Sequence, residues 1–270
     1  MEESKIEMDR VPLVEFFIQS AERLQVSPIV KYSAFSFLAD RFVPFLPTFI
    51  QAAGTSSSSW LLRPVTQSTL QLFALISLWI STKVPSFVAS LFSFATLLPF
   101  FSHRTQKSIH VFMHSCMQIH NSRPLSVACF KSLADTSIQE QHFTTRNFLE
   151  AEVLFMQVLN FEIGTANIAF FFLEDLWVQF KGVAKVGELI SIEVCMDIMD
   201  LLYEKEEMSV HFRSPKSLAA SILVTSYLIT VPKQKWEFPV LAWVNFVTSC
   251  KEDDITRLVT KILKHVLRPS

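Results

Sequence analysis

Apolar residues recur at helical spacing along most of this chain of 270 residues, and this periodicity is its main structural signal. It is clearest in 150–159, where apolar side chains recur at the spacing of a helix and polar ones form a shoulder beside them. The apolar positions are Val153, Leu154, Met156, Val158 and Leu159, and the shoulder is Glu150, Glu152 and Gln157. Apolar and polar residues nowhere alternate, as they would in a strand, for more than a few residues. The sequence also lacks the regular succession of strand and helix patterns that parallel sheets require. The predicted fold class is all-α.

The helical pattern divides the chain into two halves. Helices are predicted at 11–24, 28–42, 68–83, 124–133, 139–159, 166–180, 191–204, 215–230, 238–249 and 253–267. Pro44 and Pro47 punctuate the segment after the second helix, and 160–163 continues from the fifth as a short alternating tail with no helix stop. Two runs of about five helices, joined near 164–167, predict an N-terminal half, 1–163, and a C-terminal half, 164–270.

Composition excludes several classes of function. Hydrophobic residues make up 50% of the chain and charged residues 18%, which favours a large core over disorder. The net charge of -1 gives no basic surface for nucleic acid. Only 4 glycines occur, and no phosphate loop, nucleophile elbow or zinc-protease motif appears. We therefore expect a protein that is not an enzyme, with no metal, no cofactor and no small-molecule substrate.

The 4 cysteines are scattered and form no CxxC pair, which indicates reduced thiols. The first ten residues are charged and have no apolar signal core. We expect a protein of the nucleus and/or cytoplasm, without a membrane partner.

Several segments resemble the cyclin family, in the family's order. They are the first-helix segment 10–17, Asp40-Arg41-Phe42 at the end of the second helix, the third helix 76–83 with its terminal lysine, the fifth helix with its tail at 152–163, and the segment 211–222 of the second half. The ordered set is most similar to the small J-type cyclins of plants. It implies tandem five-helix cyclin folds: a cyclin box followed by a cyclin-like half.

The resemblance also implies a partner and a surface. The partner is a cyclin-dependent protein kinase, which a cyclin binds and activates as a non-catalytic regulatory subunit in cell-cycle or developmental control. Lys83 and Glu152 are the implied charged anchors, because such a pair can reach backbone groups at the end of a partner helix. The implied apolar contacts are Ile80, Met156, Phe161 and Ile163.

Other interpretations of these residues stay open. Ile80, Met156 and Phe161 also fit plain core packing, and Lys83 and Glu152 fit a solvated helix end and a solvated face. Cyclin-type domains also occur in transcription factors, so a protein contacting the general transcription machinery or DNA is the alternative, which the net charge disfavours. Pro12, where the family has an apolar residue, argues against docking of Arg-x-Leu substrate motifs at the first helix.

The segment 84–118 does not fit the cyclin pattern, in which the third helix meets the fourth within a few residues. Phe and Ser supply 12 of its 35 residues, and it contains no acid. Valine codons begin with GT, and Met117-Gln118 can be encoded as ATGCAG, so the coding sequence of this segment can begin with GT and end with AG, as a spliceosomal intron does. Its Phe codons are rich in thymine, and most Ser and Leu codons contain thymine. We interpret the segment as a retained intron within the N-terminal half. Weaker alternatives are a membrane span at 84–101 and a metal site from His110, His114, Cys116 and His120.

Overall fold

The computed structural model describes residues 10–52, 60–62, 64–83, 125–163, 168–204 and 214–267, and every regular element in these ranges is a helix. The predicted all-α class is confirmed. The chain divides into two compact units, residues 1–166 and 167–270. Residues 84–118, with both alternative interpretations placed on them, lie outside the described residues.

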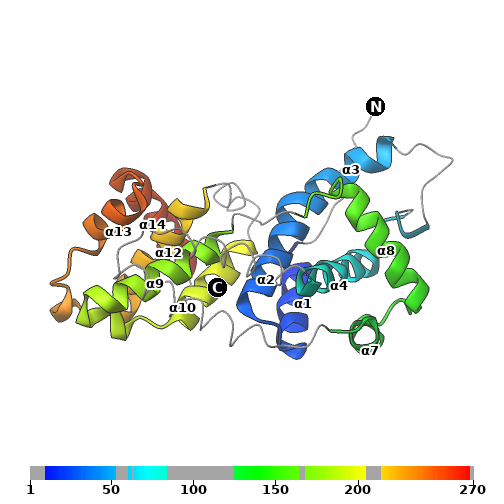
Figure 1. Ribbon diagram of the computed structural model, residues 1–270, viewed down its shortest axis with the longest axis horizontal. Helices are drawn as coiled ribbons and strands as arrows, with labels where there is room; N and C mark the ends of the chain where they lie inside the picture. The colour runs from blue at the N-terminus through cyan, green and yellow to red at the C-terminus, as the bar shows by residue number, and fades with distance from the viewer. Residues whose placement is uncertain are drawn as a thin grey trace, which may run out of the picture. The chain divides into compact units, whose positions relative to one another are not determined.

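The first unit is built around one central helix, α4 (Gln67–Lys83). The helices α1 (Arg10–Arg23), α2 (Pro28–Phe35), α7 (Val127–Ser137) and α8 (Thr145–Val158) all pack against it (Figure 1). Buried residues occupy nearly every position of α4 from Ser68 to Ser81, as expected of a helix that is apolar on all sides. The short turn η2 (Trp60–Leu62) adds two further core leucines.

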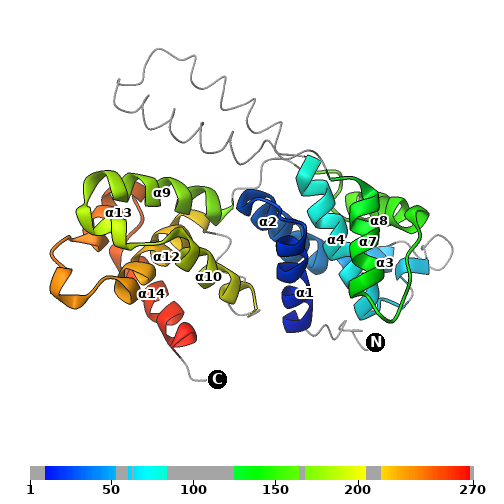
Figure 2. The same cartoon turned by 90° about the horizontal axis from the view of Figure 1, so that it is seen from below.

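The second unit has a central helix of the same kind, α12 (Pro215–Thr230). It packs against α9 (Ala169–Val183), α10 (Ile192–Tyr203), α13 (Val240–Thr248) and α14 (Glu252–Val266), which surround it in Figure 2. Two 3-10 turns, η3 (Lys185–Leu189) and η5 (Lys233–Lys235), lie in the connections. An unbroken buried run from Leu218 to Tyr227 makes α12 the core of its unit.

The predicted end of the second helix at 42, before Pro44 and Pro47, is wrong. The helix continues from α2 through a π-helical stretch, η1 (Ser36–Phe42), into α3 (Val43–Ala52), with Pro47 inside α3. The N–H of Val43 bonds to the carbonyl of Leu38, five residues back. A proline lacks an N–H and its ring clashes with the carbonyl four residues earlier. The π-helical stretch ends two residues before Pro44, and its wider turn accommodates that proline.

The predicted start of the fifth helix at 139 is also wrong, because α8 begins at Thr145. The hydroxyl of Thr144 accepts a hydrogen bond from the N–H of Asn147, and the Asn147 side chain accepts one from the N–H of Thr144. This reciprocal capping box satisfies donors that a helix start leaves unpaired. The cap therefore sets the start of α8 there.

Candidate functional site

Three phenylalanines fix how α4 and α8 approach each other. Phe42 of η1 stacks on Phe155 of α8 with ring centroids 4.5 Å apart, and Phe73 of α4 lies 4.6 Å from Phe42. All three rings are fully buried. Aromatic contacts at this separation add directional preference to their burial. The cluster therefore holds the two helices whose charged residues meet at the surface.

Lys83 and Glu152 meet where α4 ends against the middle of α8. The Lys83 Nζ atom lies 2.5 Å from Glu152 Oε1, and the two side chains are 44% and 25% exposed. Lys83 occupies the last turn of its helix, where a cation also opposes the negative end of the helix dipole. The structure thus brings together the two residues on which the cyclin resemblance places its charged anchors.

The four apolar candidates divide between core and surface. Ile80 is only 3% exposed, so its side chain belongs to the core of the first unit. Met156 and Ile163 are half-buried, whereas Phe161 is 63% exposed. Core packing therefore accounts for Ile80 but leaves the exposed ring of Phe161 unexplained.

The tail after α8 is a turn, and the prediction of a continuous tail without a helix stop is wrong. Asn160 and Phe161 both adopt left-handed backbone conformations, with φ of 53° and 57°. The N–H of Phe161 bonds to the carbonyl of Met156, and that of Asn160 to the carbonyl of Gln157. This pair of bonds is the Schellman arrangement that ends helices. Asparagine tolerates the left-handed region, but a bulky aromatic residue seldom adopts it.

A second ion pair lies beside this turn. Arg41 Nη2 of η1 is 3.8 Å from Glu162 Oε2, and the Arg41 guanidinium lies 5.9 Å from the ring centroid of Phe37. The carboxylate of Glu162 is largely exposed, so the pair itself contributes little to stability. It does tie the residue after Phe161 to a neighbouring helical segment.

Sequence reasoning missed two exposed apolar residues of α8, Leu149 and Val153. The buried stripe of α8 consists of Phe148, Ala151, Phe155 and Val158. Helical spacing predicts Val153 in the apolar face, but the structure places it outside the buried stripe, one residue from Glu152. The signal available in the sequence was an excess of apolar residues over what one buried stripe requires.

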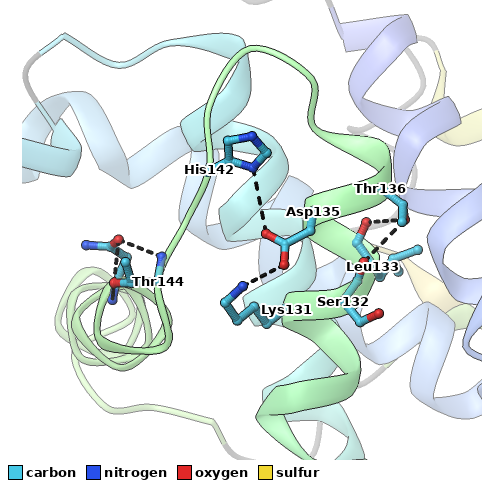
Figure 3. Close-up of polar contacts among 8 residues, drawn as sticks. Lys131, Ser132, Leu133, Asp135, Thr136, His142 and Thr144 are labelled. Atoms are coloured by element: carbon cyan, nitrogen blue, oxygen red, sulfur yellow. Dashed lines mark hydrogen bonds and ion pairs between the residues drawn. The ribbon is translucent and has the colours of Figure 1, made fainter.

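A polar hollow of about 660 Å³ lies between α7 and the start of α8. Figure 3 shows Asp135, which lines the hollow, between Lys131 and His142. Lys131 Nζ lies 2.5 Å from Asp135 Oδ2, and His142 Nδ1 lies 3.9 Å from Asp135 Oδ1. Arg146, also on its lining, pairs with Glu150 at 2.9 Å. None of the residues that line the hollow belongs to the segments that resemble the cyclin family, so it is a weaker candidate than the Lys83–Glu152 surface.

The described residues offer little other chemistry. They contain no group of three or more His, Cys, Asp or Glu side chains placed to hold a metal ion. Nor does any helix among them combine the length and apolarity needed to cross a bilayer. Burial raises the pKa of the Cys195 thiol to about 11, which keeps it protonated and unreactive at neutral pH.

Comparison with known proteins agrees with the order of the sequence motifs. The chain is 50% identical over 255 residues to Cyclin-J18 of Arabidopsis thaliana, with 94% of this chain and 93% of that protein covered. It is 44% identical over 261 residues to Cyclin-J18-like of Oryza sativa subsp. japonica, with 95% of this chain and 87% of that protein covered. No protein-family model matches the chain. On the strength of these two full-length relationships, the chain belongs to the cyclin family.

Proposed function

We propose that this cyclin binds and activates a cyclin-dependent protein kinase as its non-catalytic regulatory subunit, in cell-cycle or developmental control. Membership of the cyclin family, which regulates kinases without catalysing a reaction itself, supports the general role. The observation that carries the specific proposal is the Lys83–Glu152 ion pair between α4 and α8.

The surface around that pair has the anatomy of a protein–protein interface. Three exposed apolar side chains lie on α8, which carries Glu152, and on the turn that follows it: Leu149, Val153 and Phe161. Interfaces concentrate their binding energy in a few apolar and charged anchors, surrounded by contacts that exclude water. Leu149 lies three residues before Glu152 on α8, so this exposed apolar side chain and the carboxylate share one side of the helix.

The proposed mechanism follows from the chemistry of the pair. Lys83 donates hydrogen bonds and Glu152 accepts them, so together they can bond both the unpaired groups at one end of a kinase helix and the backbone groups of the segment beside it. Docking that helix in its active position holds the kinase's own catalytic Lys–Glu ion pair closed. The cyclin would then activate the enzyme by stabilising one of two existing conformations.

The double variant Lys83→Ala with Glu152→Ala tests the proposal. We expect it to lose co-purification of kinase from plant extract while remaining folded, because an exposed ion pair contributes only about 0–1 kcal/mol to stability. The matched control is Lys131→Ala with Asp135→Ala, which removes an ion pair of the same 2.5 Å separation from α7 of the same unit (Figure 3). The control should keep its kinase.

Two outcomes of the pull-down would count against the assignment. Unchanged kinase recovery by the Lys83 and Glu152 double variant would remove this surface from the interface. Recovery of polymerase components instead of a kinase by the wild-type protein would favour the transcription alternative. Circular dichroism and thermal unfolding of each variant establish that loss of binding is not loss of folding.

A further inference from the structure

The ammonium group of Lys83 has an aromatic neighbour in addition to Glu152. Its Nζ atom lies 3.6 Å from the centroid of the Trp79 ring, one turn earlier on α4, and 2.5 Å from Glu152 Oε1. A cation at this distance from an indole face is attracted by the ring's quadrupole, and tryptophan gives the strongest such attraction. Lys83 is therefore held by two different groups at once.

The Trp79 ring is itself fixed. It is 7% exposed, and its centroid lies 6.4 Å from that of the fully buried Phe130 on α7. A closely packed side chain has few alternative rotamers. Lys83, by contrast, has a flexible four-carbon stem that is nearly half exposed and would sample many rotamers on an open surface. The rigid Trp79 ring thus contacts the flexible lysine side chain and restricts its rotamers.

We propose that Trp79 is a positioning residue for kinase binding: it holds the Lys83 ammonium beside Glu152 before the partner arrives. This inference rests on the proposed function of the Lys83–Glu152 pair. Binding costs less when the contacting side chains are already ordered in their bound arrangement. A Trp79 variant without the indole ring keeps both charged residues in the chain, and we expect it to bind the kinase more weakly.

The second unit supplies an internal control. Trp177 and Lys181 of α9 have the same spacing, with Lys181 Nζ 4.4 Å from the indole centroid and 3.6 Å from Glu188 Oε2. A Trp177→Leu variant therefore removes the same kind of contact at a place outside the proposed kinase surface. It separates the effect of losing any cation–indole contact from the effect of losing the one at Lys83.

The first measurement needs no kinase. Aromatic ring currents shift protons above the ring upfield, so the ε-methylene protons of Lys83 should resonate upfield in the wild-type NMR spectrum. Lys83→Met identifies the signal by its disappearance. We expect Trp79→Leu to return the signal to an ordinary lysine position, Trp79→Phe to retain part of the shift, and Trp177→Leu to leave it unchanged. An upfield signal that persists in Trp79→Leu would overturn the proposal.

The second measurement is calorimetric titration with the kinase recovered by the wild-type protein. We expect Trp79→Leu to weaken affinity by roughly three- to tenfold, in line with the strength of partly exposed cation–π contacts. Trp79→Phe should weaken it less, and Trp177→Leu should not change it. In the W79L background Lys83→Met should lose less affinity than in the wild type, because the two residues act as a unit.

The outcomes keep the two proposals apart. Full additivity of Trp79→Leu and Lys83→Met in kinase affinity would make Trp79 an ordinary core residue and overturn the positioning role. If Lys83→Met leaves kinase affinity unchanged in the wild-type protein, the function proposed for the pair fails, and with it the kinase arm of this inference. The NMR arm still decides whether the ring holds the lysine. Thermal unfolding of Trp79→Phe, which retains a packed ring, controls for damage to the core.

Discussion

At the scale of single residues, Phe161 combines two unfavourable features. Its backbone is left-handed, with φ of 57°, and its ring is 63% exposed. A left-handed conformation costs a non-glycine residue roughly 1–2 kcal/mol, and an exposed ring recovers little of that through burial. Strained residues of this kind concentrate at functional sites, where the surrounding structure maintains them.

Replacing Phe161 should therefore separate stability from binding. We expect Phe161→Gly to leave the free energy of unfolding unchanged or to raise it by up to about 1 kcal/mol, since relief of strain outweighs the added entropy of glycine in the unfolded chain. Kinase affinity should fall in the same variant. Denaturant titration and calorimetric binding test the two halves, with the buried Phe155→Ala as a contrast that should lose about 3–5 kcal/mol of stability. A Phe161→Gly variant that unfolds more easily would show that the ring serves packing.

Cys195 gives a prediction on alkaline stability. Burial raises its pKa from about 9 to about 11, so the unfolded chain releases this proton at lower pH than the folded protein does. The thiol's contribution to stability is complete below pH 9 and is lost as the pH rises through 11. We expect the stability difference between the wild type and Cys195→Ala to shrink as the pH is raised across this window. Urea titrations at a series of pH values would show it, and a constant difference would contradict the buried-thiol assignment.

At the scale of elements, the start of α8 depends on local hydrogen bonds. Thr144→Ala removes the hydroxyl that accepts from the N–H of Asn147, and loss of such an N-cap costs about 1 kcal/mol. We expect a lower midpoint of thermal unfolding for Thr144→Ala. Thr145→Ala, one residue inside the helix and outside the capping box, is the control and should have a much smaller effect. Equal destabilisation by both variants would mean that the cap does not determine where α8 begins.

The same elements show how far sequence reasoning reaches. Apolar periodicity predicted α4 to within one residue at its start and predicted both ends of α12, because buried helices carry their pattern along their whole length. The start of α8 was missed because an asparagine in the third helical position replaced the glutamate that usually marks a capping box. The passage of a helix through Pro44 was missed because a π turn leaves no signal in the periodicity.

The candidate site was only partly predictable from the sequence. Lys83 and Glu152 lie in motifs that match the cyclin family, so their sequence positions carried the information. Trp79 lies inside the third-helix segment 76–83, and Leu149 lies just before the fifth-helix segment 152–163. The relevance of each residue depends on which way its side chain points. That direction follows from the packing of α4 against α7 and α8, which a linear pattern does not contain.

At the scale of the whole molecule, the two units share a plan in which one buried helix is surrounded by the others. In the first unit the central helix is α4, and in the second it is α12. Membership of the cyclin family implies tandem cyclin folds, and these two central helices give that implication a physical form. In the first unit, the segment 84–118 belongs to the connection between α4 and α7.

The two helices that this connection joins, α4 and α7, pack against each other. Trp79, one turn before the last residue of α4, has its ring centroid 6.4 Å from that of Phe130, in the first turn of α7. If 84–118 were removed, residues 119–126 would join Lys83 to Val127. Eight residues reach roughly 26–29 Å when extended, and helix–helix connections of about 2–8 residues are common. The architecture of the first unit therefore does not require the 35 residues of 84–118.

We predict that 84–118 is a retained intron and that the shorter chain is the functional cyclin. Transcript sequencing across the Lys83 codon should find messages that lack the corresponding 105 nucleotides, three for each of the 35 residues. A recombinant chain without 84–118 should unfold at no lower temperature than the full chain, because α4 and α7 keep their contacts. It should bind kinase at least as well, since the segment follows Lys83 directly in sequence. Transcripts that all carry the 105 nucleotides would show that the segment is a genuine insertion, and a shorter chain that fails to fold would show that the first unit depends on it.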